Sequence, residues 1–323
     1  MQVRRRDFLQ LAAGAVAVPV GSGLGWAQSY PTRPVQIIVG FPAGSGPDIV
    51  ARLAAQWLAE RLGQQFIVDN RPGAGSNLGT EAAARAAPDG YTMLMTVATN
   101  TVNATLYENL KFDFLRDIAP VTCMAGTAYI MAVTPSLAAK TGPEFIAYAK
   151  ANPGKINMAS SGVGSASHVT GELFKMMAGI DMVHVPYRSN YLADLLSGQV
   201  QVTFAPTPSV IGYIKQGQLR ALGVTSTGRM DLLPDVPAVA EFVPGYEAIG
   251  WYGFGVPAGT PSEIVNLLTK AINATVAEPA AKEKLAGLGL DPMTMSTAEF
   301  DKFVRAETEK WAKVIKFAKI TVN

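Results

Sequence analysis

Residues that bind metals or form disulfides are scarce in this chain. Its 323 residues include one cysteine, Cys123, and two histidines, His168 and His184. A single cysteine excludes an intrachain disulfide, and neither histidine lies in a metal-binding motif such as HExxH. We therefore expect no metal site and no cofactor.

Charge is also scarce. Charged residues make up 16% of the chain against 49% apolar residues, and the formal net charge is +2. This composition is typical of a globular protein with large cores, and the length allows two ordinary domains. The chain lacks the basic excess that binds nucleic acid, and beyond its N-terminus no segment approaches the roughly 18 uncharged apolar residues of a membrane span. We expect a monomer without a nucleic-acid partner.

The N-terminus has the pattern of an export signal. A basic start with Arg5 and Arg6 precedes an uncharged stretch over residues 8–26, and small residues lead up to Ala27. This pattern predicts a signal peptide at residues 1–27 that is removed after about Ala27, with the mature protein in the periplasm. The RRDFL sequence fits a twin-arginine signal, with a Sec signal and a retained membrane anchor as alternatives. Removal of the signal lowers the formal net charge from +2 to zero.

Short β-branched blocks alternate with helical patterns along the rest of the chain, which indicates the α/β fold class. The first series predicts strands at 35–39, 66–68 and 92–96 and helices at 48–62 and 78–86. The second predicts strands at 130–133, 156–160, 182–185, 200–204 and 221–224 and helices at 143–151, 168–177, 192–197 and 209–215. Irregular chain at 225–250 precedes a strand at 251–256 and two helices, one at 262–288 that is interrupted near Pro279 and one at 298–319.

The repeated pattern predicts two lobes, each a mostly parallel sheet flanked by helices. We expect the first lobe to comprise residues 28–128 together with residues 248–323, and the second lobe to comprise residues 129–247. Because the chain crosses between the lobes more than once, a ligand cleft is expected between them.

The stretch GFPAGSGPDIV, residues 40–50, joins the first predicted strand to the first helix. Free backbone N–H groups and the positive end of a helix dipole favour an anion at such a turn. Gly44 and Gly46 allow close approach, Ser45 adds a hydroxyl, and Pro47 suits an early helical position. Asp48 would repel an anion, so we expect it to cap the helix or to pair with donors of the neighbouring lobe. A tight turn without a ligand is the alternative.

A second entrance of the same type lies in the other predicted lobe, at MASSGVGSASHVTGELF, residues 158–174. Serines alternate with Gly162 and Gly164 before a helix, so hydroxyl and amide donors are dense there. Two such entrances at equivalent positions suggest a clamp on a small acid, outside the carboxyl ends of parallel strands. We expect the Ser165 hydroxyl to donate to this ligand without a role in folding.

Other sequence motifs give weaker indications of function. GAGSNLG at residues 73–79 has one residue too many for the dinucleotide fingerprint GxGxxG, and we interpret it as structural, with Asn77 at the start of a helix. No GxSxG elbow or Walker motif occurs, and His168 has no obvious orienting acid at a triad spacing, so we expect no enzymatic activity. A secreted hydrolase of carboxylate esters or amides is the alternative function, because the residues of a catalytic triad can be far apart in the sequence and meet only in the folded protein.

The sequence resembles the solute-binding receptors of tripartite tricarboxylate transporters, called TctC-like or Bug proteins. The resemblance rests on YPTRPVQIIVGFPAGSGPDIVAR, VDNRPGAGSNLGTEAAARAAPDGYTMLM, ASSGVGSASHVTGELF, VHVPYR and GWYGFGVPAGTP. It implies a two-lobed, type II-like periplasmic-binding-protein fold that captures a small mono- or dicarboxylate without reaction. It also implies delivery to the membrane permease subunits of such a transporter. A sensory receptor that docks on a histidine kinase is the alternative.

The resemblance also implies ligand contacts, made mainly through neutral donors and ordered water. The first lobe would contribute residues 41–48 and the second lobe residues 161–167, with further walls near 96–100 and from Tyr187. The candidate ligand-binding residues are Phe41, Ala43, Gly44, Ser45, Gly46, Asp48, Thr96, Thr99, Ser161, Gly164, Ser165, Ser167, Tyr187, Tyr191 and Asp194.

One segment departs from the family. Members usually have glycine, a few small residues and proline between the VPYR-like strand and the DLL helix, whereas this chain reads VPYRSNYLADLLSGQV, about two residues shorter. Tyr191 could wall off a smaller site or stack on an aromatic acid, so aliphatic and aromatic acids are both candidates. A surface turn without a ligand contact is the alternative for this segment. If neutral donors did not bind the acid, Arg71 or Arg188 would bind it instead.

Overall fold

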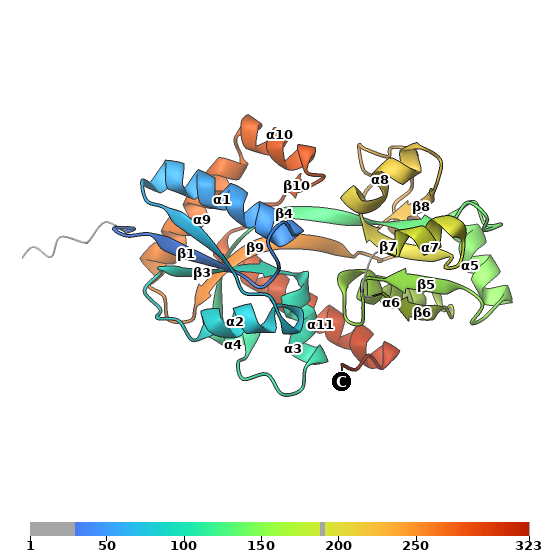
Figure 1. Cartoon of the computed structure of the whole chain (residues 1–323), viewed down its shortest axis with the longest axis horizontal. Coiled ribbons are helices and arrows are strands. Elements are labelled where there is room, and N and C mark those ends of the chain that lie inside the picture. Colours follow the sequence, from blue (N-terminus) through green and yellow to red (C-terminus); the bar gives the residue numbers. More distant parts are fainter. Residues whose placement is uncertain (1–29, 188–190, 323) are drawn as a thin grey trace, which may run out of the picture.

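The structure is a computed structural model that describes residues 30–187 and 191–322 (Figure 1). The expected signal peptide at residues 1–27 lies outside this range. One sheet runs through the molecule in the strand order β2-β1-β3-β9-β4-β7-β5-β6, and β8 and β10 also pair with β4. Figure 1 shows two groups of strands and helices, which the long strands β4 and β9 connect.

The first group, called the first lobe, forms around three parallel strands. These are β1 (Val35–Val39), β2 (Phe66–Asn70) and β3 (Thr92–Val97), and a short β10 (Asp291–Pro292) pairs antiparallel with β4. The helices of this lobe are η1 (Ala74–Ser76), α1 (Gly46–Leu62), α2 (Asn77–Ala84), α3 (Ala98–Leu106), α4 (Phe114–Asp117), α9 (Ser262–Val276), α10 (Pro279–Gly287) and α11 (Thr297–Ala318).

The second group, called the second lobe, repeats this arrangement. Its parallel strands are β5 (Asn157–Ser160), β6 (Val183–Pro186) and β7 (Val202–Pro206), and β8 (Arg220–Val224) pairs antiparallel with β4. Its helices are α5 (Gly142–Ala151), α6 (Ala166–Ala178), α7 (Leu192–Ser197), α8 (Thr207–Lys215) and η2 (Val239–Glu241).

Two antiparallel strands, β4 (Ile118–Val133) and β9 (Ile249–Pro257), carry the chain between the lobes. The last pair between them joins Ala128 to Ile249, and the next residue of β4, Tyr129, pairs with Pro206 of β7. The pairing partner of β4 therefore changes from β9 to β7 between two successive residues. We call residues 125–129 of β4 and 249–252 of β9 the junction.

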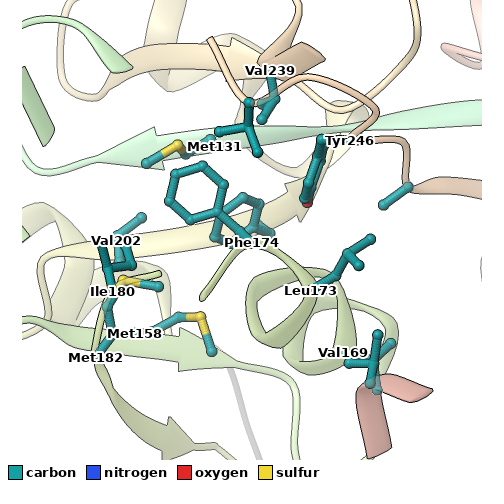
Figure 2. Close-up of a cluster of buried hydrophobic side chains, with 14 of the residues drawn as sticks. Met131, Met158, Val169, Leu173, Phe174, Ile180, Met182, Val202, Val239 and Tyr246 are labelled. Atoms are coloured by element: carbon teal, nitrogen blue, oxygen red, sulfur yellow. The ribbon is translucent and has the colours of Figure 1, made fainter. Parts of the chain in front are cut away.

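A large buried cluster fills the second lobe between its sheet and α6 (Figure 2). It contains Met131 of β4, Met158 of β5, Val202 of β7 and Phe174 of α6. The Phe174 ring packs against Phe204 with ring centroids 5.4 Å apart. The cluster continues into the first lobe through Val102 and Leu106 of α3 and Trp311 and Ile315 of α11. The two lobes thus share buried apolar contacts on the α3–α11 side of the molecule.

The structure confirms the α/β class and most of the predicted elements, with two corrections. Residues 96–100 are not merely a strand end, because α3 begins at Ala98. The predicted strand at 130–133 is the end of the sixteen-residue β4. Parallel ladders join three strands in each lobe, while β4 and β9 pair antiparallel with their neighbouring strands. The lobe boundaries at 128 and 247 remain a prediction. Within residues 30–187 and 191–322, no helix has the length and apolarity of a membrane span.

Candidate functional site

Both lobes direct the carboxyl ends of their parallel strands toward the junction. In the first lobe Val97, the last residue of β3, pairs with Tyr252, which in turn pairs with Ala125 of β4. In the second lobe Pro206, the last residue of β7, pairs with Tyr129. Ala125 and Tyr129 lie roughly 13 Å apart along an extended strand. The loops after β1 and β5 therefore belong to two carboxyl edges on either side of the junction, where α/β folds bind ligands.

Asp48 holds the first of these loops together. Its carboxylate is 2% exposed and accepts hydrogen bonds from the Gly44 N–H at 2.8 Å, Asn70 Nδ2 at 2.9 Å and Arg52 Nε at 3.0 Å. Burial alone would raise the pKa of Asp48, but the hydrogen bonds from Arg52, Gly44 and Asn70 lower it below its ordinary value. The expectation that Asp48 caps the helix or pairs with the neighbouring lobe is wrong, because none of its three donors is a backbone amide of α1 and all three lie in its own lobe.

The start of α1 carries unpaired donors. Ser45 is the N-cap residue, and its hydroxyl is buried without a hydrogen-bond partner in the part of the chain that the structure describes. Pro47 lies in the first turn, as predicted, and the N–H groups of this turn have no acceptor within the helix. A Cβ at Gly46 would lie 2.8 Å from the Tyr252 hydroxyl, so this tyrosine lies directly against the helix start. Hydroxyl and amide donors thus gather at the positive end of a helix dipole.

The loop at residues 73–76 lies beside the first loop and is strained. All four of its residues have positive φ, from 47° to 139°, including the non-glycine residues Ala74 and Ser76. The side chain of Asn103 in α3 secures the loop, because its Nδ2 donates to the Gly75 carbonyl at 2.6 Å. Asn77 starts α2, as predicted, and its Nδ2 is buried without a partner among residues 30–187 and 191–322. Backbone strain of this kind often accompanies a functional site.

The serines of the second loop bind mainly to the loop itself. The Ser165 hydroxyl donates to the Gly162 carbonyl at 2.7 Å and accepts the His168 N–H at 3.4 Å as the N-cap of α6. The Ser167 hydroxyl accepts the Ser161 N–H at 3.0 Å. The expected ligand donor Ser165 is therefore a helix cap with a role in folding. The exposed Ser161 side chain is the freer donor of this loop.

Two histidines lie next to the second loop. The Gly164 N–H donates to His168 Nδ1 at 3.1 Å, and the Ser160 hydroxyl lies 2.6 Å from His184 Nε2. Burial lowers the pKa of His168 to about 3 and that of His184 to about 4, so both rings are neutral at neutral pH. Ser160 is fully buried, so this serine–histidine pair is not presented to a substrate.

The second loop also contacts the first lobe. Gly164 has a φ of 74°, and the space that a Cβ would occupy there is filled by Cδ2 of Leu106 in α3. Leu106 belongs to the same buried cluster as Val169 and Leu173 of α6. The candidate residue Gly164 therefore lies at a contact between the lobes, and its small size is what permits that contact.

The third candidate segment is turned inward. The Tyr187 hydroxyl donates to Asp194 Oδ2 at 2.6 Å, and this hydrogen bond raises the pKa of Tyr187 to about 12. Tyr191 is buried in an apolar cluster of the second lobe and packs edge-on against Tyr187 with ring centroids 6.1 Å apart. This packing leaves the Tyr191 ring little free surface for an aromatic ligand. Ser189 and Asn190, the rest of the shortened segment, lie outside the described residues, as does Arg188.

The other candidate residues divide between the two faces of the first lobe. Phe41 packs partly against the core beneath α1, Ala43 is exposed on the first loop, and Thr99 lies half-buried in the first turn of α3. Thr96 is on the opposite face of the sheet, where it lines a cavity of about 10 Å³ with Phe114 and Phe300. Thr96 therefore does not join the group at the junction.

The charges and metal ligands near the junction are few. The Arg71 side chain pairs with Asp69 at 2.7 Å. Across the described ranges, no group of three or more histidine, cysteine, aspartate or glutamate side chains could hold a metal ion.

The sequence analysis gave no ligand-binding role to Tyr252 or to the loop at 73–76. The tyrosine lies in mid-strand, and the loop was interpreted from its failed dinucleotide spacing. The position of this loop shortly after β2, a parallel strand of the same lobe, is the feature that would have indicated a candidate site.

The chain is similar to known proteins in both sequence and fold. The family model described as tripartite tricarboxylate transporter family receptor matches residues 50–320. The protein BugT of Bordetella pertussis is 33% identical over 311 residues, which cover 95% of this chain and 94% of the relative. The structure of R. palustris Rpa4515 with adipate has a TM-score of 0.78 at 34% identity, covering 90% of this chain and 99% of that one. MatC (Rpa3494) from Rhodopseudomonas palustris with bound malate has a TM-score of 0.74 at 26% identity, covering 88% and 100%.

Proposed function

Because the chain belongs to the receptor family of tripartite tricarboxylate transporters, a family of binding proteins rather than enzymes, we propose that it captures a small carboxylic acid between its two lobes. It would then deliver the acid to the membrane permease subunits of such a transporter. The ligand is bound and released unchanged, which agrees with the burial of the Ser160–His184 pair.

The observation that carries this proposal is the pair of helix starts at the two carboxyl edges. The helix α1 has seventeen residues and α6 has thirteen, so each contributes a helix dipole whose positive end favours an anion. The first lobe adds the unpaired Ser45 hydroxyl, and the second lobe adds the exposed Ser161 side chain. These neutral donors can bind a carboxylate without a fixed positive charge.

We infer that the preferred ligand is a small aliphatic dicarboxylate. Two relatives of known structure contain such an acid, adipate in one and malate in the other. The spacing of roughly 13 Å between the two carboxyl edges along β4 suits an acid with an acceptor at each end. The buried packing of Tyr191 favours an aliphatic over an aromatic acid.

Capture would occur by closure of the lobes about the junction. Each lobe supplies only part of the donors, so an acid gains its full set of hydrogen bonds only when both lobes contact it. The lobes would comprise residues 28–128 with 248–323 and residues 129–247, and the permease would recognise the closed arrangement. The predicted export signal at residues 1–27 supports a periplasmic location.

A ligand screen tests this function. We would measure the unfolding transition of the mature protein with adipate, malate, succinate and benzoate, and with the diamides of the diacids as uncharged controls. A ligand at a hundredfold excess over its Kd stabilises the folded state by about 2.7 kcal/mol, which shifts the transition by several degrees. We expect at least one diacid to do so while its diamide does not. Equal shifts with acid and diamide, or mass analysis showing chemical conversion of the ligand, would contradict the proposal.

A further inference from the structure

Tyr129 and Tyr252 stand out among the tyrosines of the molecule. Tyr246 is almost completely buried, and its hydroxyl donates to the Thr170 carbonyl at 3.0 Å. Tyr129 is 6% exposed, and its hydroxyl has no hydrogen-bond partner among the residues that the structure describes. The hydroxyl of the half-buried Tyr252 also has no hydrogen-bond partner within those residues.

Each hydroxyl lies over a glycine, one in the junction and the other at the start of α1. A Cβ at Gly250 would lie 2.8 Å from the Tyr129 hydroxyl, and a Cβ at Gly46 would lie 2.8 Å from the Tyr252 hydroxyl. Gly250 belongs to β9, and Gly46 is the first residue of α1. The glycines leave room for the phenol groups, one over the crossing strands and the other against the helix start.

The strand register places the two tyrosines on one surface. Tyr252 pairs with Ala125, and Gly250 pairs with Thr127. Residues two apart on a strand share a face, so Tyr252 and Gly250 of β9 lie on the same side as Ala125, Thr127 and Tyr129 of β4. The unpaired hydroxyls are therefore on one face of the strands that connect the lobes, between the two carboxyl edges.

Neither tyrosine hydroxyl has a hydrogen-bond partner within the described chain and neither is fully buried, so both are free to bind a molecule that enters between the lobes. We propose that Tyr129 and Tyr252 form the floor of the ligand site and that their hydroxyls donate hydrogen bonds to the bound acid. The inference rests on the proposed function. Tyr252 would bind the carboxylate at the start of α1, and Tyr129 would bind the end of the ligand nearer the second lobe. Two such donors favour a small dicarboxylate over a monocarboxylate.

The electrostatics of both groups agree with a role as neutral donors. Burial raises the pKa of Tyr129, and the nearby Tyr252 adds to this effect. Burial also raises the pKa of Tyr252. Both phenols therefore keep their protons over the whole physiological range, and each can donate to a carboxylate without adding a charge of its own.

The test combines two isosteric substitutions with one control. Tyr129→Phe and Tyr252→Phe remove only the hydroxyls, and Tyr148→Phe removes an exposed hydroxyl from α5, away from the junction. Because the hydroxyls of Tyr129 and Tyr252 have no partner within the described chain, we expect both variants to unfold without ligand at the wild-type temperature or slightly above it. Their affinity for adipate or malate should fall roughly tenfold or more, the effect of a lost hydrogen bond to a charged group.

The outcomes separate this inference from the proposed function. If the wild-type protein binds one of the diacids and both variants bind it equally well, the floor assignment is wrong and the receptor function stands. Loss of stability in the ligand-free Tyr129→Phe variant would mean that the hydroxyl is structural, which also contradicts the assignment. If the wild-type protein binds neither these diacids nor any other acid of the screen, the proposed function fails and the inference with it. The Tyr148→Phe control should match the wild type in both measurements.

Discussion

The imidazole rings of His168 and His184 lie parallel, with their centroids 3.5 Å apart and their planes inclined by 8°. The stack joins the start of α6 to β6, and His168 accepts the N–H of Gly164 in the second loop through Nδ1. A proton on Nδ1 would remove this acceptor and would place a charge against the neighbouring ring. The loop therefore depends on neutral histidines.

Stability should fall in mild acid for this reason. The folded-state pKa values of His168 and His184 are lowered to about 3 and about 4, so below pH 6.5 the unfolded chain takes up protons that the folded chain does not. The free energy of unfolding should decrease as the pH falls from 7 toward 4, by up to about 1.4 kcal/mol per pH unit for His168 and by less for the more exposed His184.

Urea unfolding at several pH values measures this slope. Burial raises the pKa of Glu172, which acts in the opposite direction, so a Glu172→Gln background isolates the histidines. In that background His184→Gln, whose amide can still pair with Ser160, should show a smaller slope. An unchanged slope in His184→Gln would contradict the role of the stacked pair.

Asp48→Asn should destabilise the first loop. The substitution removes the charge that pairs with Arg52 and weakens the hydrogen bonds to Gly44 and Asn70. We expect a loss of about 1–3 kcal/mol in the free energy of unfolding, with weaker ligand binding because the start of α1 is no longer fixed. Asp301→Asn is a matched control, since Asp301 and Arg305 form an exposed pair at the same spacing on α11. The control should lose at most about 0.5 kcal/mol, and an equal effect in both variants would refute the positioning role.

The two serines of the second loop should separate stability from binding. Ser165→Ala removes the cap of α6 and should lower the free energy of unfolding by about 1 kcal/mol. Ser161→Ala should leave stability unchanged and weaken binding of the preferred acid, because the Ser161 side chain is exposed and has no hydrogen bond within the described chain. Calorimetric titration and urea unfolding on both variants check this division. The reverse pattern would show that the hydroxyls have the opposite roles.

Gly46→Ala should weaken binding through Tyr252. The added Cβ would lie 2.8 Å from the tyrosine hydroxyl, so the ring must move away from the helix start. Gly212→Ala in α8 is the matched control, because a Cβ there meets no atom within 4 Å. We expect the control to bind like the wild type and to be slightly more stable, as alanine is a better helix former. Wild-type affinity in Gly46→Ala would mean that Tyr252 does not contact the ligand.

Local signals in the sequence predicted the two helix entrances. Pro47 lies in the first turn of α1, as predicted, whereas Ser165, which was expected to donate to the ligand, caps α6. The helix α3 was missed because its residues ATNTVNATL include several weak helix formers. Its polar side chains secure it through tertiary contacts. Asn100 Nδ2 donates to Thr80 Oγ1 at 2.9 Å, and Asn103 Nδ2 to the Gly75 carbonyl.

The parts of the site that depend on distant residues could not be predicted. Asp48 owes its role to Asn70, which lies at the end of another strand. Tyr129 and Tyr252 come together because β4 and β9 pair across more than a hundred residues of chain. No spacing within a single segment indicates such a contact, and a tyrosine in a strand is usually a core residue.

Small-angle scattering with and without ligand tests the capture of an acid between two lobes most directly. The acid that gives the largest shift in the unfolding screen would be compared with its diamide at the same concentration. We expect the acid to reduce the radius of gyration, because both helix starts favour its charge and the lobes must approach to contact it together. The diamide should leave the radius unchanged. A tightly bound acid that leaves the radius of gyration unchanged would contradict capture by closure of the two lobes.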